Sequence, residues 1–193
     1  MTDTYIENWF INDGLKNFEL ILPEFIDKEV KFLQIGAYTG DASLWIVDNI
    51  LTNPNSVLID IDTWEGSDEP SHKVMNWSGV ETFYDAKTMQ ARNSRKILKI
   101  KNTSDWFFKN NLEKFDFIYV DGDHTAQGVI KDAVNSFDSL KVGGVLAFDD
   151  YLWSAGLGTT KEPRMAIDAF KSIYSEHLET LVDGYQMWFR KKQ

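Results

Sequence analysis

The chain has 193 residues, a formal net charge of −10 and no cysteine. Hydrophobic residues make up 43% of it, enough for one domain with a substantial core. The absence of cysteine excludes disulfides and thiolate metal sites, so any metal must bind to oxygen or imidazole. The acidic charge disfavours a nucleic-acid partner, and the lack of a long apolar segment or a leader disfavours a membrane. We therefore expect a soluble, cytoplasmic, single-domain protein over residues 1–193, and the sequence leaves its oligomeric state open.

Short apolar runs typical of buried parallel strands alternate with amphipathic helical patterns along the chain. The runs are Lys31–Gly36, Val57–Ile61, Ile97–Ile100, Phe115–Val120 and Gly144–Phe148. In the helical pattern after the fourth run, an apolar stripe faces the core and Lys131, Asp132 and Asp138 turn outward. The alternation predicts an α/β, Rossmann-like core over residues 31–193, preceded by a helical segment over residues 1–30.

The C-terminal segment has the pattern of a β-hairpin. The dipeptide Asp183-Gly184 suits a tight turn with positive φ between two antiparallel strands. The strands that it would join are Leu178–Val182 and Tyr185–Phe189.

The first apolar run leads into a turn with two glycines, Gly36 and Gly40, and then into a helix predicted over Asp41–Leu51. Glycines let the backbone approach a ligand closely, and the N-terminus of a helix offers free N–H donors. This pattern indicates a nucleotide-like ligand, although the spacing Gly-x-x-x-Gly lacks the full dinucleotide motif. The alternative is a tight strand-to-helix turn without a ligand.

Two carboxylates, Asp60 and Asp62, close the second run about 20 residues beyond the glycine turn. An acid at this position of a Rossmann-like fold accepts hydrogen bonds from ribose hydroxyls. Alternation along the strand puts both side chains on the same side, and we prefer Asp62 because it lies at the more open end. Either residue could instead be a solvated carboxylate at a strand end.

Further carboxylates follow the fourth and fifth runs. Asp121 ends one run, and Asp149 and Asp150 end the next. The carboxyl ends of neighbouring strands meet at one edge of a sheet, where ligands bind. Three carboxylates in one cleft repel one another unless a cation or protons compensate them, which indicates Mg²⁺ or another hard divalent ion. Helix capping or acceptance of backbone hydrogen bonds is the alternative role.

His124 lies three residues beyond Asp121, in the loop before a helix. Its ordinary pKa near 6.5 suits it to take a proton from a hydroxyl, so it is the candidate base, with Asp121 beside it as the second catalytic residue. A capping or packing role is the alternative. For His72 and His177 we expect surface or packing roles.

The least regular stretch, Thr63–Ser78, is predicted to form a loop over the mouth of the site. Several aromatic residues are candidates for the wall of an acceptor pocket, with core packing as the alternative. They are Trp9, Phe10, Trp64, Trp77 and Trp153.

Four segments of the chain resemble the class I S-adenosylmethionine-dependent methyltransferases, and within them the macrocin-type sugar O-methyltransferases. They are Gln34–Gly40, Asp62–Gly66, Val120–His124 and Gly143–Tyr151. The resemblance implies a three-layer sandwich around a seven-stranded, mostly parallel sheet whose last strand is antiparallel. It also implies that Asp121, Asp149 and Asp150 are metal ligands and that His124 is the base.

By the same resemblance, S-adenosyl-L-methionine is the cofactor, the glycine turn holds its methionine end and Thr103 or Ser104 lies near its adenine. Gln34 replaces a common acidic residue, so the contact to the amino group of the cofactor is weakened or made by an amide. The residues that would bind the cofactor are Gln34, Gly36, Ala37, Tyr38, Gly40, Asp60, Asp62, Thr63, Trp64, Thr103, Ser104 and Asp121.

These features together predict metal-assisted O-methylation of a hydroxyl on a small molecule or sugar. The alternative is a non-catalytic module that binds a nucleoside-like ligand or a protein on the same fold. Methylation of nucleic acid would require a proline-rich base-binding motif where this chain has Asp121-Gly122-Asp123-His124.

Overall fold

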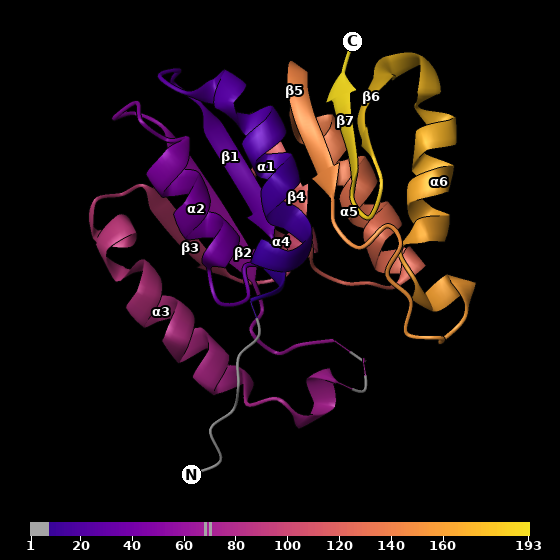
Figure 1. Cartoon of the computed structure of the whole chain (residues 1–193), viewed down its shortest axis with the longest axis horizontal. Coiled ribbons are helices and arrows are strands. Elements are labelled where there is room, and N and C mark those ends of the chain that lie inside the picture. The colour runs from indigo at the N-terminus through magenta and orange to yellow at the C-terminus, as the bar shows by residue number, and fades with distance from the viewer. Residues whose placement is uncertain (1–7, 68, 70) are drawn as a thin grey trace.

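The computed structural model describes residues 8–67, 69 and 71–193. Within these residues, seven strands form one sheet in the order β3-β2-β1-β4-β5-β7-β6 (Figure 1). The strands are β1 (Lys31–Ile35), β2 (Val57–Asp62), β3 (Ile97–Lys101), β4 (Phe115–Val120), β5 (Leu140–Phe148), β6 (Leu178–Asp183) and β7 (Met187–Lys191). β7 pairs antiparallel with β5 and β6, whereas β1 to β5 pair in parallel. The predicted sheet, with an antiparallel last strand, is confirmed.

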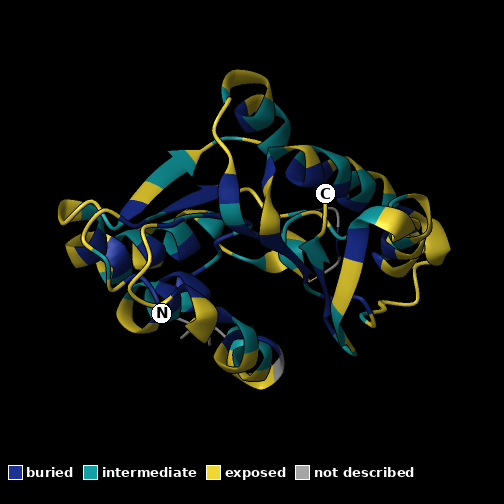
Figure 2. Ribbon diagram, turned by 90° about the horizontal axis from the view of Figure 1, so that it is seen from above, coloured by how far each residue is buried: buried dark blue, intermediate teal, exposed yellow. Residues whose placement is uncertain are grey.

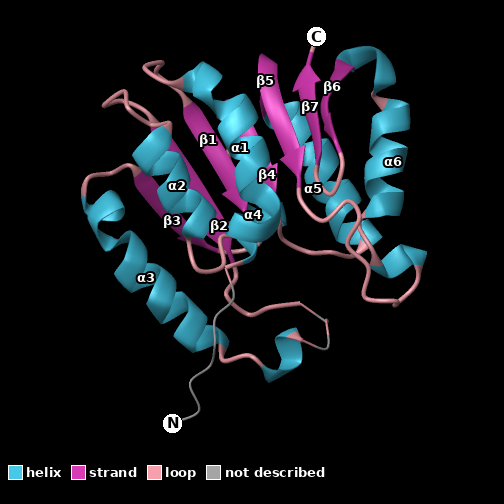
Figure 3. Ribbon diagram, viewed as in Figure 1, coloured by secondary structure: helices cyan, strands magenta, loops and turns pink. Residues whose placement is uncertain are grey.

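Helices cover both faces of the sheet, as the views in Figure 2 and Figure 3 show. α1, α2 and α3 pack on one face, and α4, α5 and α6 on the other. Their bounds are α1 (Leu15–Ile21), α2 (Asp41–Asn49), α3 (Trp77–Asn93), α4 (Ser104–Asn110), α5 (Ala126–Ser139) and α6 (Arg164–Ile173). Short helical turns are η1 (Phe10–Gly14), η2 (Leu22–Phe25), η3 (His72–Val74), η4 (Thr159–Lys161) and η5 (Ser175–His177). In the described part of the chain, no helix has the length and apolar character needed to cross a membrane.

A hydrophobic core lies on each face of the sheet, because successive side chains of a buried strand point to opposite faces. In β4, Phe117 and Tyr119 face α1, whose Phe18 packs on both rings at centroid distances of 5.9 and 5.0 Å. Ile118 and Val120 of the same strand face the other way, into the cluster that contains residues of α5 and α6. Each strand therefore joins two layers, which explains the nearly continuous apolar runs.

Two local predictions are wrong. Asp132 is buried at 4% exposure instead of facing outward, because its position on α5 is turned toward a pocket. The hairpin between β6 and β7 exists, but Gly184 lacks a positive φ. The connection is three residues long, Gly184–Gln186, and the Gly184 N–H donates to the Gln186 carbonyl at 3.1 Å.

The order of the strands places the site. From β1 the chain moves to β2 and β3 on one side of the sheet, and then returns to β4 and β5 on the other side. The helices α2 and α3 therefore lie on one face of the sheet and α5 and α6 on the other. A crevice opens between the two groups at the carboxyl ends of β1 and β4. The glycine turn follows β1 and Asp121 follows β4, so both predicted motifs meet at this crevice.

Candidate active site

A cavity of about 850 Å³ opens at the carboxyl ends of β1, β2, β4 and β5. This volume lies in the range of small-molecule and cofactor sites. Most predicted site residues line the cavity: Gln34, Gly36, Ala37, Tyr38, Asp62, Thr63, Thr103, Ser104, Asp121, His124, Asp149 and Asp150. Three predicted cofactor residues do not line it, namely Gly40, Asp60 and Trp64.

The glycine turn brings the backbone of β1 against that of β4. Gly36 has φ +83°, and a Cβ on it would lie 1.8 Å from the carbonyl oxygen of Asp121. Only glycine fits there. Gly40, at φ +79°, precedes α2 and packs under Tyr84 and Thr88. Its role is to start the helix, which is why it does not line the cavity.

Asp62 holds the glycine turn in place. Its Oδ2 accepts hydrogen bonds from the N–H groups of Ala37 and Tyr38 at 2.8 and 2.9 Å. Its Oδ1 accepts from the Trp64 N–H at 2.7 Å. The Thr63 N–H also donates to this carboxylate, so Asp62 shapes the loop with nearly all of its acceptor capacity, and a ribose hydroxyl would have to share an oxygen with one of these N–H groups.

Asp60 and Trp64 serve the core under the loop. Asp60 has no exposed surface and accepts a hydrogen bond from the Tyr84 hydroxyl at 2.7 Å. Trp64 is 2% exposed, and its indole N–H donates to the Tyr38 carbonyl. Asp60 precedes the open end of β2 by two residues, so Tyr84 of α3 covers it and it does not line the cavity. Of the two aspartates that the sequence offered for the ribose, the structure thus favours Asp62, the one we preferred.

The buried Asp60 yields a stability prediction. Burial raises its pKa to about 7, so in the folded protein it holds a proton that the unfolded chain loses near pH 4. Folding is therefore progressively penalised as the pH rises from about 4 to 7, by on the order of 2–4 kcal/mol at the plateau. Asp60→Asn removes the charge that must be desolvated, so its gain in unfolding free energy should be larger at pH 8 than at pH 5. Urea unfolding at both pH values measures this, with Asp138→Asn on the exposed face of α5 as control; an equal effect at both would contradict it.

Gln34 supports the glycine turn from below. Its amide nitrogen donates to the Gly36 carbonyl at 3.0 Å, and its amide oxygen accepts from the Ser43 hydroxyl at 3.3 Å. The side chain is 2% exposed. An amide suits this position because it can donate to the turn and accept from α2 at the same time.

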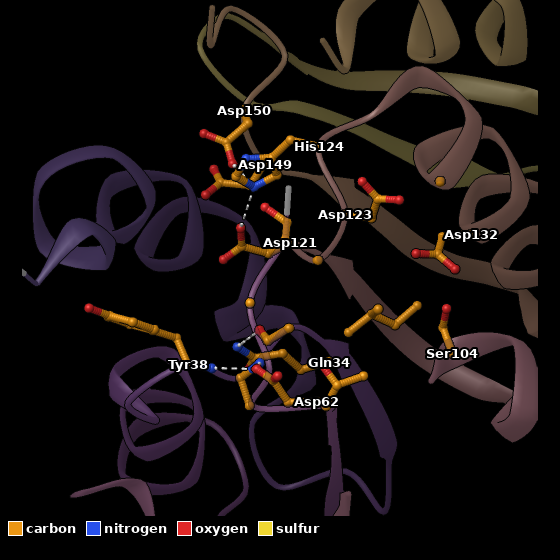
Figure 4. A pocket seen from close by; sticks show the side chains of 18 of the residues that line it. Gln34, Tyr38, Asp62, Ser104, Asp121, Asp123, His124, Asp132, Asp149 and Asp150 are labelled. Carbon is orange, nitrogen blue, oxygen red and sulfur yellow. Dashed lines mark hydrogen bonds and ion pairs between the residues drawn. The ribbon is translucent and has the colours of Figure 1, made fainter. Parts of the chain in front are cut away.

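At the ends of β4 and β5, ligating atoms of Asp121, His124 and Asp150 lie within 4.8 Å of one another (Figure 4). His124 Nε2 is 3.0 Å from Asp150 Oδ2 and 4.0 Å from Asp121 Oδ1. Among the described residues, this group differs from the predicted metal set by one member. His124 takes the place of Asp149, whose Oδ1 accepts from the Gln186 amide at 2.6 Å.

Burial and mutual repulsion shape the charges of this group. Burial, and then the neighbouring carboxylates, raise the pKa of Asp149 well above its usual range. Burial raises the pKa of Asp121 to about 7, although His124 opposes the rise. Burial alone would lower the pKa of His124, but Asp121, Asp150 and Glu69 hold it well above its usual value. The cluster thus has an excess of negative charge that a cation or bound protons must compensate.

Glu69, in the loop after β2, is a site residue that the sequence analysis missed. Its Oε1 lies 3.0 Å from His124 Nδ1, yet Nδ1 has no partner with hydrogen-bond geometry in the described part of the chain. The contact is therefore an ion pair. His72, for which we expected a surface or packing role, also lines the cavity and lies 3.7 Å from Glu69. The loop was predicted to cover the mouth, but no periodic pattern shows which of its side chains turn inward.

Aromatic side chains surround the mouth. The Trp9 and Tyr38 rings stack at a centroid distance of 4.9 Å, and Trp153 lies edge-on to His124 at the same distance. Tyr185, in the hairpin turn, donates its hydroxyl hydrogen bond to Asp150 Oδ1 at 3.0 Å. Trp9, Phe10, Trp77 and Trp153 line the cavity, and Trp64 does not.

The sheet order and the cavity at its switch point define the Rossmann-like fold of the methyltransferases, and solved structures of this class superpose on the chain. A putative rRNA-methylase from Clostridium thermocellum gives a TM-score of 0.69 at 10% identity and covers 94% of this chain and 97% of its own. The O-methyltransferase TomG from Streptomyces achromogenes, in complex with SAM, gives 0.65 at 11% identity and covers 92% and 79%. The O-methyltransferase from Bacillus cereus, in complex with SAH, gives 0.60 at 13% identity and covers 98% and 94%.

The chain belongs to the methyltransferase domain family, whose model matches residues 33–151. This range is more than half of the chain, and it runs from β1 past the end of β5. It therefore contains the glycine turn, Asp62, and the carboxylate and histidine group. A comparison with curated proteins found no match.

Proposed function

We propose that the protein transfers the methyl group of S-adenosyl-L-methionine to a hydroxyl oxygen of a small molecule or sugar, with assistance from a divalent cation. The observation that carries the proposal is the convergence of Asp121, His124 and Asp150 at one end of a cavity that the glycine turn also lines. The resemblance to the macrocin-type sugar O-methyltransferases supports a hydroxyl acceptor. The O-methyltransferase neighbours support it as well.

The glycine turn, Asp62 and the loop after β3 are the residues that would hold the cofactor. Backbone N–H groups at the start of α2 suit the methionine carboxylate, and Asp62 suits the ribose hydroxyls. S-adenosyl-L-methionine supplies an electrophilic methyl group on a sulfonium ion. The carboxylates that line the cavity favour this positive charge.

The donor set at the ends of β4 and β5 fits a hard divalent cation. Asp121 and Asp150 offer carboxylate oxygens within 4.8 Å of each other, and buried carboxylates without a compensating charge are costly. Asp149, the third metal ligand predicted from the sequence, lies next to Asp150 and is hydrogen-bonded to Gln186. Bound there, Mg²⁺ or Mn²⁺ would lower the pKa of a hydroxyl on the acceptor.

In the proposed reaction, His124 takes the proton of the acceptor hydroxyl on its Nε2. This requires that a cation compensates the charge of Asp121 and Asp150, because these carboxylates otherwise hold the pKa of His124 high and keep its ring protonated. A bond forms between the acceptor oxygen and the methyl carbon while the carbon–sulfur bond breaks, and S-adenosylhomocysteine leaves. Asp121 and Asp150 orient the acceptor and compensate the charge of His124 once it is protonated. The protein contributes mainly by positioning the two reactants in line.

Titration calorimetry with S-adenosylhomocysteine, with and without Mg²⁺, tests the cofactor half of the proposal. We expect saturable binding in both conditions, because neither Asp62 nor the glycine turn supplies a ligand to the proposed cation. Release of S-adenosylhomocysteine from the methyl donor, measured over a panel of catechols and sugar vicinal diols, tests the transfer half. We expect EDTA to stop it and Mg²⁺ or Mn²⁺ to restore it. Activity that persists in EDTA would remove the cation from the proposal.

A non-catalytic binding module is the rival function. It predicts cofactor binding without transfer to any member of the panel. The retained carboxylate and histidine group argues against it, because a module that only binds a nucleoside has no use for buried charges at the far end of the cavity. Our proposal further has the enzyme act in the cytoplasm on a small molecule and not on nucleic acid, in keeping with its net charge of −10.

A further inference from the structure

A buried amide side chain lies behind the carboxylates at the end of β5. Gln186 is the last residue of the turn between β6 and β7, and it has no exposed surface. Its Nε2 donates to Asp149 Oδ1 at 2.6 Å and to the Tyr119 hydroxyl at 3.3 Å. Gln186 lies outside residues 33–151, the part of the chain that matches the methyltransferase domain family. The proposed reaction gives this side chain no role.

The orientation of the Gln186 amide follows from its other partners. Its Oε1 accepts hydrogen bonds from the Trp188 indole N–H at 3.0 Å and from Asn17 Nδ2 at 2.8 Å. An indole N–H can only donate, so the amide oxygen must face Trp188 and the amide nitrogen must face Asp149. Trp188 has no exposed surface, and Asn17 belongs to α1. The amide therefore cannot turn over without leaving buried polar groups unpaired, which is costly.

Asp149 is held by neutral donors. The Tyr119 hydroxyl accepts from Gln186 and hydrogen-bonds to Asp149, which closes a triangle of three side chains. In the described part of the chain, no cationic side chain forms an ion pair with Asp149. The donors therefore fix the direction of the carboxylate and leave its negative charge uncompensated. Asp149 lines the cavity, so the oxygen that Gln186 does not hold can reach a cation bound beside Asp150.

We propose that Gln186, assisted by Tyr119, is a positioning residue that holds Asp149 in the orientation in which it binds the divalent cation, an inference that rests on the proposed function. Partners of this kind keep a metal-binding carboxylate in place, so the cation does not have to order it on binding. They also stabilise its negative charge, because both donate hydrogen bonds to it. Through Asn17, the same network ties the cation site to α1.

Binding of Mn²⁺ to the full chain, followed by the electron paramagnetic resonance of the free ion, tests this proposal without turnover. Gln186→Met keeps the length of the side chain and removes the amide. We expect it to weaken Mn²⁺ binding by about 10- to 100-fold, the usual effect of losing such a partner. The affinity for S-adenosylhomocysteine should stay at the wild-type value, because the glycine turn and Asp62 hold the cofactor. Gln90→Met, on the exposed face of α3, is the matched control and should change neither affinity.

Tyr119→Phe is the second variant, and it removes a single hydroxyl from the network. It should weaken Mn²⁺ binding by about 3- to 10-fold, the effect of one hydrogen bond, whereas Tyr174→Phe, outside the cavity, should not. Unchanged Mn²⁺ affinity in Gln186→Met, or in Tyr119→Phe if the first variant does not fold, would overturn the positioning role alone. An equal loss of affinity for S-adenosylhomocysteine would overturn it too, because the role would then be a general structural one. A wild type that binds S-adenosylhomocysteine but no Mn²⁺ would overturn the cation of the proposed function and this inference with it.

Discussion

His124→Gln is expected to slow methyl transfer by about 10²- to 10⁴-fold, the range over which a positioned general base contributes. Glutamine keeps a polar side chain in the contact between Asp150 and Glu69 but cannot accept the proton. Because the proposal assigns the cation to the carboxylates, the affinity for Mn²⁺ should change little. The rate is measured as S-adenosylhomocysteine released with the best acceptor of the panel, and Mn²⁺ affinity by calorimetry.

The control for this variant is His177→Gln. His177 lies in η5, outside the cavity, so its replacement should leave both the rate and Mn²⁺ binding unchanged. If His124→Gln loses Mn²⁺ binding together with activity, His124 is a metal ligand, as its place within 4.8 Å of Asp121 and Asp150 allows. An unchanged rate would mean that it is neither a base nor a ligand.

Gly36→Ala is expected to abolish binding of S-adenosylhomocysteine. The new Cβ would lie 1.8 Å from the carbonyl oxygen of Asp121, a backbone atom that cannot move without displacing the end of β4. Positive φ adds a cost of about 1–2 kcal/mol for any residue other than glycine. The variant should therefore lose both cofactor affinity and stability, measured by calorimetry and by thermal unfolding.

Gly143→Ala separates these two effects. Gly143 has nearly the same φ, +82°, but its added Cβ would meet nothing within 4 Å. It should show the loss of stability caused by backbone strain and keep the affinity for S-adenosylhomocysteine. Cofactor binding that survives in Gly36→Ala would show that the close approach of the two strands is dispensable.

Glu69 links the loop after β2 to the reacting group. Its ion pair with His124 joins a residue of the loop to the end of β4, across the cavity. A closed loop would exclude water from the methyl group and hold the imidazole ring. Trp9, stacked on Tyr38, covers the cavity from the N-terminal side in a similar way.

The sequence by itself determined the layers of the fold and the edge of the sheet at which the site lies. Strands buried on both faces leave continuous apolar runs, and these runs located all five parallel strands to within a few residues. Motifs directly after such strands, like Gly36 and Asp121, were located for the same reason. Parallel strands bring their carboxyl ends to one edge, so position along the chain already implies position in space.

Only the tertiary structure decided what each polar side chain touches. Asp60 and Asp62 share a strand and a side, but α3 covers one while the other reaches the glycine turn. Asp132 and Asp138 belong to one helix, yet one faces a cavity and the other solvent. Glu69 meets His124 across 55 positions of sequence, through a loop without periodicity. Such contacts depend on how neighbouring elements pack, and local patterns of hydrophobicity carry no information about that packing.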